Sequence, residues 1–509
     1  MSLIALVKRL RDIMRKDSGV DGDAQRLAQV VWLIFLMVFD KREFESECTV
    51  DNYIPVIPEG YRWRDWAGTK ENINSKELLT GDDLLDFVNN KLIPVLSGNS
   101  IIVNGQKIVP FDKTDARSLK VKEVMSGCIN YMKNGVLLRD VINLFNEVNF
   151  ENAHEVHEFN DVYETLLKGL QSAGSMGEFY TNRAITDFAI SKVKPQLGGT
   201  LADWAMGTGG FLVSALNYME LQAINNSEKQ KMLQTAVRGG ELKPMAFRLG
   251  FTNLLLHKID LPNVRHGDSL CEKNLNEFNG DDLVDYCALN PPYGGVALKE
   301  DLDCFPADLR SSETADMFVA LAVKRLKEGG RGVIVLPDGF LFGNDNAKVA
   351  IKKYFLSECN LHTIIRLPQS CFAPYTSIAT NLLFFDKGES TKNIWYYRLD
   401  MPEGYKHFSK TKPMLREHFT CADEWWDNRK EIVDVKEHED MSITYKSKMY
   451  SIDEIEANGY NLDLCGYPVE EKIILSPEET IANFVKRRAE WDTAMDMKIA
   501  EIKVLLGVK

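Results

Sequence analysis

The chain has 509 residues, of which 45% are hydrophobic and 27% are charged, a composition that is ordinary for globular proteins with a large core. Its formal net charge of −13 excludes a protein that grips nucleic acid through an overall positive charge, so any such contact must be local or supplied by a partner. None of the nine cysteines forms a CxxC pair, which favours reduced thiols in a cytoplasmic protein over a disulfide framework or a zinc site.

The first part of the chain, residues 1–165, shows apolar residues at helical spacing and few strand signals, so we predict an all-helical N-terminal domain. Its clearest helical stretches are residues 24–45 and 160–173. The longest apolar run, from Val30 to Phe39, is shorter than the roughly 20 residues that a membrane span needs, so we expect a buried helix and no membrane partner. This part contains no catalytic pattern.

Residues 166–390 alternate short β-rich runs with helical stretches. The predicted strands are residues 200–206, 236–242, 263–268, 284–290, 332–337, 362–368 and 379–385, and the predicted helices include residues 211–224, 244–257 and 316–329. Such alternation predicts an α/β domain built on a mostly parallel seven-stranded sheet. Ligands of such sheets bind at the carboxyl ends of the strands.

The last part of the chain is mixed and aromatic over residues 391–475 and then helical over residues 476–509. Ser476 is the expected N-cap of this helix, Pro477 its first residue and Glu479 the reciprocal cap. Apolar residues then recur at Ile481, Phe484, Val485, Met495, Ile499, Ile502 and Leu506. This pattern predicts an amphipathic helix that either packs on its own domain or docks on a partner chain.

Three successive predicted strands end in groups that suit a nucleoside ligand. The stretch "DWAMGTGGFL" places Gly207, Gly209 and Gly210 where the backbone must approach a ligand closely, and it lacks the Lys of a phosphate-binding loop. Glu241 ends the next strand, where one carboxylate can accept from both ribose hydroxyls, although it also suits a solvent-facing helix start. Asp268 ends the third strand and suits either the exocyclic amine of an adenine or a capped turn.

The fourth of these strands ends in "NPPY". Two prolines cannot continue a strand ladder, so Pro291 and Pro292 stop the strand and form a rigid turn. That turn offers carbonyl oxygens, the amide of Asn290 and the ring of Tyr293, a set that suits a planar ligand bearing an amine. The ordered occurrence of all four strand ends is more specific than any one of them.

These motifs, in this order, resemble those of the adenosylmethionine-dependent amino-methyltransferases that act on DNA, in particular the gamma group of N6-adenine methyltransferases. The segment "MGEFYTNR", ending at Arg183, looks like the cofactor-contacting segment of that group. Further stretches, "RLKEGGRGVIVLPDGFLFG", "IIRLPQSCFAPYTSIATNLLFFDKG" and "GYNLDL", are similar to the methylation (M) subunits of type I restriction–modification systems. The resemblance covers most of the chain and implies a Rossmann-like methyltransferase domain.

The resemblance also implies roles for individual residues. Those expected to hold S-adenosylmethionine are Glu178, Phe179, Tyr180, Thr181, Asn182, Arg183, Asp203, Gly207, Thr208, Gly209, Gly210, Glu241 and Asp268. Asn290, Pro291, Pro292 and Tyr293 are expected to hold the target adenine, with Phe372 stacking on its other face unless this ring is only a core residue. The chain departs from the family pattern at Trp204, where Pro is usual, and at Glu178 and Asn182, where Gln and Pro are usual.

The partners implied by the resemblance are double-stranded DNA, a separate specificity (S) chain that reads the sequence, a second M chain and a nuclease–translocase (R) chain. An acidic methylation subunit then needs no overall positive charge, because another chain reads the DNA. Two alternatives stay open from the residues alone. One is a stand-alone amino-methyltransferase acting on RNA, protein or cytosine N4, and the other is a non-catalytic scaffold of a defence complex.

Overall fold

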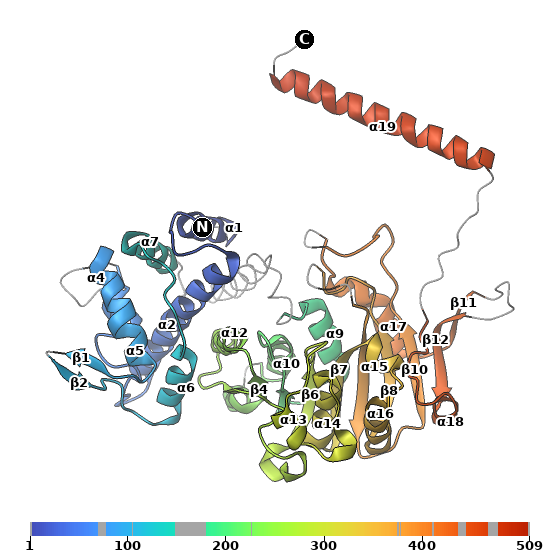
Figure 1. The fold of residues 1–509 in the computed structure, drawn as a ribbon, viewed down its shortest axis with the longest axis horizontal. Coiled ribbons are helices and arrows are strands. Elements are labelled where there is room, and N and C mark those ends of the chain that lie inside the picture. Colours follow the sequence, from blue (N-terminus) through green and yellow to red (C-terminus); the bar gives the residue numbers. More distant parts are fainter. Residues whose placement is uncertain are drawn as a thin grey trace. The chain divides into compact units, whose positions relative to one another are not determined.

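The computed structural model describes residues 3–69, 78–103, 105–147, 180–224, 226–373, 376, 378–409, 412–435, 444–466 and 477–506 (Figure 1). The chain divides into two compact units, Met1–Gly466 and Tyr467–Lys509. The helix expected at 160–173, the domain boundary expected at 165 and the residues Glu178, Phe179 and Ser476 fall outside the described residues.

The N-terminal part is built around one long buried helix, α2. Its helices are α1 (Leu3–Met14), α2 (Asp23–Thr49), α3 (Trp63–Trp66), α4 (Gly81–Asp86), α5 (Ile93–Leu96), α6 (Ala116–Met125) and α7 (Gly135–Asn146), and a π-helical stretch, Phe87–Leu92, joins α4 to α5. The apolar run from Val30 to Phe39 is buried throughout, which confirms the expected core helix. Among the helices that the structure describes, none is both long and apolar enough to cross a membrane.

One element of this part was not expected. Strands β1 (Ile101–Val103) and β2 (Gln106–Ile108) form an antiparallel hairpin, so the prediction of an all-helical domain is wrong here. Gly105 has φ of +76°, which is the left-handed conformation that a tight hairpin turn requires. The sequence contained a signal for this hairpin, because the pair Asn-Gly at 104–105 stands between the short runs 101–103 and 106–109, which are rich in β-branched residues.

The remainder of the first unit is built on one large sheet. Its strands are β3 (Leu201–Asp203), β4 (Val237–Glu241), β5 (Asn263–His266), β6 (Val284–Leu289), β7 (Leu326–Pro337), β8 (Cys359–Arg366), β9 (Thr380–Lys387), β10 (Asn393–Arg398), β11 (Ile432–Val435) and β12 (Thr444–Ser451). They lie in the order β11-β12-β10-β8-β9-β7-β6-β3-β4-β5, with parallel pairing of β10 with β8 and throughout β7-β6-β3-β4-β5.

All seven predicted strands are present, as β3 to β9, but the prediction of a seven-stranded sheet is wrong. Among the described residues this sheet has 10 strands, because residues 391–475 add three more, β10, β12 and β11, next to β8. Strand β10 pairs with the backbone groups of β8 that would otherwise form an unpaired sheet edge, and β12 and β11 continue the sheet beyond β10. Residues 326–329, which we expected at the end of a helix, begin β7 instead.

Helices cover both faces of the sheet, giving three layers (Figure 1). They are α9 (Arg183–Val193), α10 (Gly210–Glu220), α11 (Ser227–Met232), α12 (Pro244–Leu256), α13 (Lys299–Asp303), α14 (Thr314–Arg325), α15 (Asp338–Phe342), α16 (Asn346–Glu358), α17 (Thr420–Asp427) and α18 (Ile452–Ala457), while α19 (Pro477–Leu506) belongs to the second unit. The sheet and its helices form two hydrophobic cores. One core contains residues of α9, α10 and α12, and the other contains residues of α14 and α16. Alternate residues of β7 enter different cores, with Val333 in the first and Ile334 in the second.

The helical part packs against α12 and thereby supports one end of the sheet. Arg248 of α12 is buried, and its Nε donates to the carbonyl of Val124 at 2.8 Å while its Nη2 donates to that of Ser126. Lys120 of α6 donates to the carbonyl of Val264 in β5 at 2.6 Å. The N-terminal helices therefore brace the half of the sheet whose strand ends carry the predicted site.

Candidate active site

Four strand ends meet at one edge of the sheet. Asp203 ends β3, Glu241 ends β4, Asp268 follows β5 and Asn290 follows β6, and these four strands are parallel neighbours. A cavity of about 110 Å³ opens at this edge, and Glu241, Asp268 and Asn290 line it together with Trp204, Leu242 and Leu270. The structure therefore brings three of the predicted strand-end side chains into one cavity, at the place where open α/β sheets bind ligands.

The glycine turn is attached to Glu241. Gly207 and Gly209 have φ of +54° and +79°, so both use the left-handed conformation, and the backbone N–H of Gly207 donates to Glu241 Oε2 at 2.9 Å. The carbonyl of Thr208 accepts from Asn253 Nδ2 at 3.0 Å, and α10 begins at Gly210. The turn is thus held by both α12 and the carboxylate that ends β4.

The two buried carboxylates differ in where they point. Glu241 is 7% exposed and lines the cavity; burial raises its pKa, and the N–H groups of Lys243, at 2.7 Å, and of Gly207 partly oppose that rise. Asp203 is buried and accepts from the N–H of Ala205 at 3.0 Å, and burial holds its pKa well above the usual range, with a further contribution from the charge of Glu241. Asp203 therefore shapes the turn after β3, whereas Glu241 lines the cavity.

Residues 180–183 connect the glycine turn to the Asn-Pro-Pro-Tyr turn. Arg183 Nη1 donates to the carbonyl of Gly210 at 2.7 Å, and Asn290 Nδ2 donates to Thr181 Oγ1 at 3.1 Å. Asn182 caps α9 by accepting from the N–H of Ala184 at 2.9 Å, and its Nδ2 donates to the carbonyl of Met414 at 3.1 Å. This segment, expected only to contact the cofactor, also positions the side chain of Asn290.

The amide of Asn290 is held at both ends. Its Nδ2 donates to Thr181 and its Oδ1 accepts from the hydroxyl of Tyr293. Burial raises the pKa of Tyr293 well above its usual value, so the hydroxyl stays protonated and able to donate at neutral pH. A carbonyl oxygen has two lone pairs, so Oδ1 can accept a second hydrogen from a ligand amine.

Phe372 lies in the wall of a second cavity, of about 280 Å³. Tyr180, Arg183 and Met414 line the same cavity. The ring of Phe372 is buried in the hydrophobic core against which Tyr293 packs. Residues 180–183 therefore lie between the two cavities. Tyr180 and Arg183 line the second cavity, and Thr181 contacts Asn290, which lines the first cavity.

Sequence reasoning missed several residues of the first cavity. Leu242 comes directly after Glu241, and Leu270 comes two residues after Asp268. Their positions next to strand-end carboxylates could have predicted that they form apolar walls of the cavity. Ser269 and Thr314 also line it, and among the described residues their buried hydroxyl oxygens have no hydrogen-bond partner. Thr314 comes from α14, and no pattern near it in the sequence points to the site. Trp204, where the family usually has Pro, lines the cavity with the guanidinium of Arg325 5.0 Å from its ring.

Known proteins resemble this chain over most of its length. The model of the N-6 DNA methylase family matches residues 154–473. The methylase subunit of the type I restriction enzyme EcoEI from Escherichia coli is 44% identical over 491 residues, which cover 96% of this chain and 95% of that protein. A crystal structure of a modification subunit of a putative type I restriction enzyme from Vibrio vulnificus has a TM-score of 0.74 at 36% identity, covering 92% of this chain and 96% of that one.

A third relative comes from a structure on complex assembly and conformational transition of the type I restriction–modification system. It has a TM-score of 0.76 at 32% identity and covers 100% of this chain and 99% of that chain. The family match and the fold define the class: the chain belongs to the N-6 DNA methylase family. Within that family it is a methylation subunit of a type I restriction–modification system.

Proposed function

We propose that this chain transfers a methyl group from S-adenosylmethionine to N6 of adenine in double-stranded DNA, in the cytoplasm, at sites chosen by a separate specificity chain. The observation that carries the proposal is the doubly held amide of Asn290 beside the cavity that Glu241 and Asp268 line. Family membership supplies the reaction class, and the geometry supports a role for each residue.

The chemistry of the cavity fits the proposed cofactor. Glu241 offers carboxylate oxygens to two ribose hydroxyls, Asp268 offers an acceptor to an exocyclic amine, and Leu242 and Leu270 offer apolar walls for a planar ring. The left-handed glycines leave room for a ligand to approach the backbone beside Glu241. When bound, S-adenosylmethionine supplies a methyl group on a positively charged sulfur.

The proposed task of the Asn-Pro-Pro-Tyr turn is to activate the adenine amine. The N6 lone pair is delocalised into the ring, which makes the amine a poor nucleophile. Asn290 Oδ1 and the carbonyl of Pro291 each accept one N6 hydrogen, which draws the nitrogen toward tetrahedral geometry and aims its lone pair out of the ring plane. This is catalysis by positioning and electrostatics, so no nucleophilic side chain takes part.

A base inside a duplex cannot reach this edge of the sheet, so we propose that it is rotated out of the helix. The rings of Tyr293 and Phe372 then stack on the extruded base and contribute about 1–3 kcal/mol for each contact. The hydroxyl of Tyr293 contacts Asn290, which supports its part in this assignment, and Phe372 lines the neighbouring cavity that Tyr180 and Arg183 also line.

The proposed partners are the specificity chain, a second methylation subunit and the nuclease–translocase chain. Helix α19 is a candidate for binding one of them, because it carries large apolar side chains, among them Phe484, Val485 and Trp491, that no other described element of their own unit covers. The net charge of −13 agrees with an enzyme that leaves sequence reading to another chain.

Two variants test the assignment in the complex with the cognate specificity chain. Asn290→Ala should keep cofactor binding, measured by calorimetry, and lower the methyl-transfer rate by about 10²–10³-fold, because a preorganised acceptor is lost. Glu241→Ala should weaken cofactor binding itself. Equal loss of both properties in Asn290→Ala would show that the turn has been misassigned.

The same preparation tests the subunit role. Strong sequence-specific methylation by the chain without any specificity chain would contradict it and favour a stand-alone methyltransferase. Failure of the unmodified chain to bind S-adenosylmethionine would leave only a scaffold role.

A further inference from the structure

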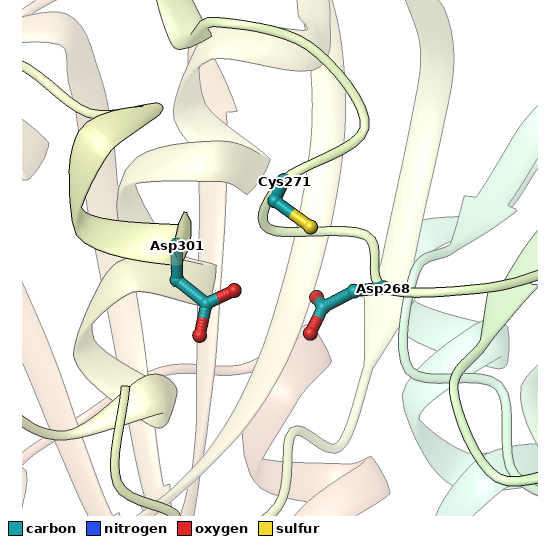
Figure 2. A group of neighbouring side chains, drawn as sticks. All are labelled: Asp268, Cys271 and Asp301. Carbon is teal, nitrogen blue, oxygen red and sulfur yellow. The ribbon is translucent and has the colours of Figure 1, made fainter. Parts of the chain in front are cut away.

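Three ionisable side chains converge beside the proposed cofactor cavity, namely Asp268, Cys271 and Asp301 (Figure 2). A carboxylate oxygen of each aspartate and the sulfur of Cys271 all lie within 4.8 Å of one another. Asp268 and Cys271 belong to the loop after β5, and Asp301 belongs to α13. The sequence offered no metal-binding pattern here, because these side chains come from two separate segments rather than from paired cysteines.

Asp301 provides an independent sign of a missing ligand. The residue is 3% exposed, and its Oδ2 accepts from the N–H of Leu298 at 2.7 Å. Oδ1 is buried and has no hydrogen-bond partner among the described residues. Figure 2 shows the carboxylates of Asp301 and Asp268 facing each other across a gap, with the Cys271 sulfur beside it. A buried carboxylate oxygen without a partner is costly, so the arrangement calls for a cation or a shared proton.

The electrostatics of the group favour a cation. Asp268, Asp301 and, when ionised, Cys271 place negative charges within one small group. A charged guanidinium near them is that of Arg265. Arg265 itself donates to the backbone carbonyl of Asp268 at 2.6 Å and lies 3.6 Å from the carboxylate of Glu272. A divalent cation would favour the charged forms of all three ligands at once.

We propose that Asp268, Cys271 and Asp301 bind one zinc ion, with water completing the coordination. One thiolate selects against magnesium and calcium, and a tetrahedral zinc site accepts one sulfur at about 2.3 Å and two oxygens at about 2.0–2.2 Å. Ligand atoms around such an ion are roughly 3.5 Å apart, so the observed group, whose atoms lie within 4.8 Å of one another, needs to draw together by at most about 1.3 Å. A small shift of the loop after β5 or of the five-residue helix α13 supplies this movement.

The site has a consequence for catalysis, and this part rests on the proposed function. Asp268 lines the cofactor cavity, where we assign it to the adenine amine of S-adenosylmethionine. Zinc would draw negative charge and one oxygen of Asp268 away from that amine, so we expect zinc and cofactor to compete. Zinc should therefore raise the KM for S-adenosylmethionine and leave kcat unchanged.

The binding experiment uses the full-length chain with zinc in competition with a chromophoric chelator, and cobalt(II) as a spectroscopic probe. We expect one ion per chain and a single thiolate-to-cobalt absorption band. Cys271→Ser should abolish the band, and Asp301→Asn should weaken binding at least tenfold. Cys421→Ser is the matched control, because Cys421 is an exposed free cysteine of α17 outside the group, and it should change neither property.

A second measurement guards against variants that merely fail to fold. Without metal, Asp301→Asn removes one of the two facing carboxylates and should raise the melting temperature, while it lowers zinc affinity. Zinc binding that survives both Cys271→Ser and Asp301→Asn, or no zinc retained at micromolar concentration, would overturn the site. Zinc binding that leaves S-adenosylmethionine affinity unchanged would overturn the competition alone, and a zinc-free chain that binds no cofactor would instead overturn the proposed function.

Discussion

Thr181 is the residue whose role the structure changes most. Its hydroxyl accepts from Asn290 Nδ2 at 3.1 Å, so it orients the amide whose oxygen is assigned to the target amine. Thr181→Val removes this acceptor at nearly constant volume, and one lost hydrogen bond of about 1 kcal/mol should lower kcat roughly fivefold to tenfold. The KM for S-adenosylmethionine should stay unchanged, and Thr181→Ser should restore kcat. Steady-state kinetics of the complex with the specificity chain measures both; a raised KM with normal kcat would return Thr181 to a cofactor contact.

Asp203 shows how one buried residue links stability to pH. Its pKa in the folded chain lies well above the usual value because of burial, so the folded state binds a proton that the unfolded state releases. The stability contributed by this group is complete below the ordinary aspartate pKa and is lost as the pH rises toward the folded value. Asp203→Asn keeps the acceptor for Ala205 and removes the charge, so it should raise the free energy of unfolding at pH 7 by on the order of 1 kcal/mol or more.

Urea denaturation of the cofactor-free chain from pH 5 to pH 8 checks this prediction. The advantage of Asp203→Asn over the unchanged chain should shrink as the pH is lowered. An advantage that grows on acidification would mean that the carboxylate is stabilised in its charged form.

At the scale of elements, the glycine turn and α12 approach each other closely at Gly250. A Cβ at this position would lie 3.0 Å from the carbonyl oxygen of Gly207 and 3.0 Å from Met206 Cε. Gly250→Ala should therefore push the glycine turn away from α12, cost about 1–3 kcal/mol of stability through overpacking, and weaken S-adenosylmethionine binding. Gly339→Ala in α15 is the control, since a Cβ there meets nothing within 4 Å. Calorimetry compares the two; equal cofactor affinity would show that the turn accommodates the methyl group without moving.

At the scale of the whole molecule, the chain separates the proposed catalytic unit from a second unit that contains α19. Phe484 and Trp491 are exposed on α19 at a spacing of two helical turns. The double variant Phe484→Asp and Trp491→Asp should leave cofactor binding and melting temperature unchanged and weaken association with the specificity chain about tenfold or more, because apolar contact area is lost. Lys486→Asp with Thr493→Asp, on exposed positions of the same helix, is the matched control. Analytical ultracentrifugation measures the assembly, and equal association of both variants would contradict a docking role.

The sequence by itself determined the catalytic sheet and the chemistry of its strand ends. Short apolar runs predicted all of β3 to β9, because a strand buried on both faces needs apolar residues on both sides. Asp203, Glu241, Asp268 and Asn290 could be placed together because parallel strands bring their carboxyl ends to one edge. Such signals are local, since each strand carries its own periodicity and its own final residue.

Only the tertiary structure decided which separate segments meet. The addition of β10 beside β8, the contact of Thr181 with Asn290 and the approach of Asp301 to Cys271 all join residues whose own neighbourhoods contain no sign of the other. Periodicity reports how deeply an element is buried, whereas the identity of its neighbour depends on loop paths and on packing between distant elements. For this reason the strand-end carboxylates could be predicted from the sequence. The groups that position the site residues, or that compete for them, could be identified only from the fold.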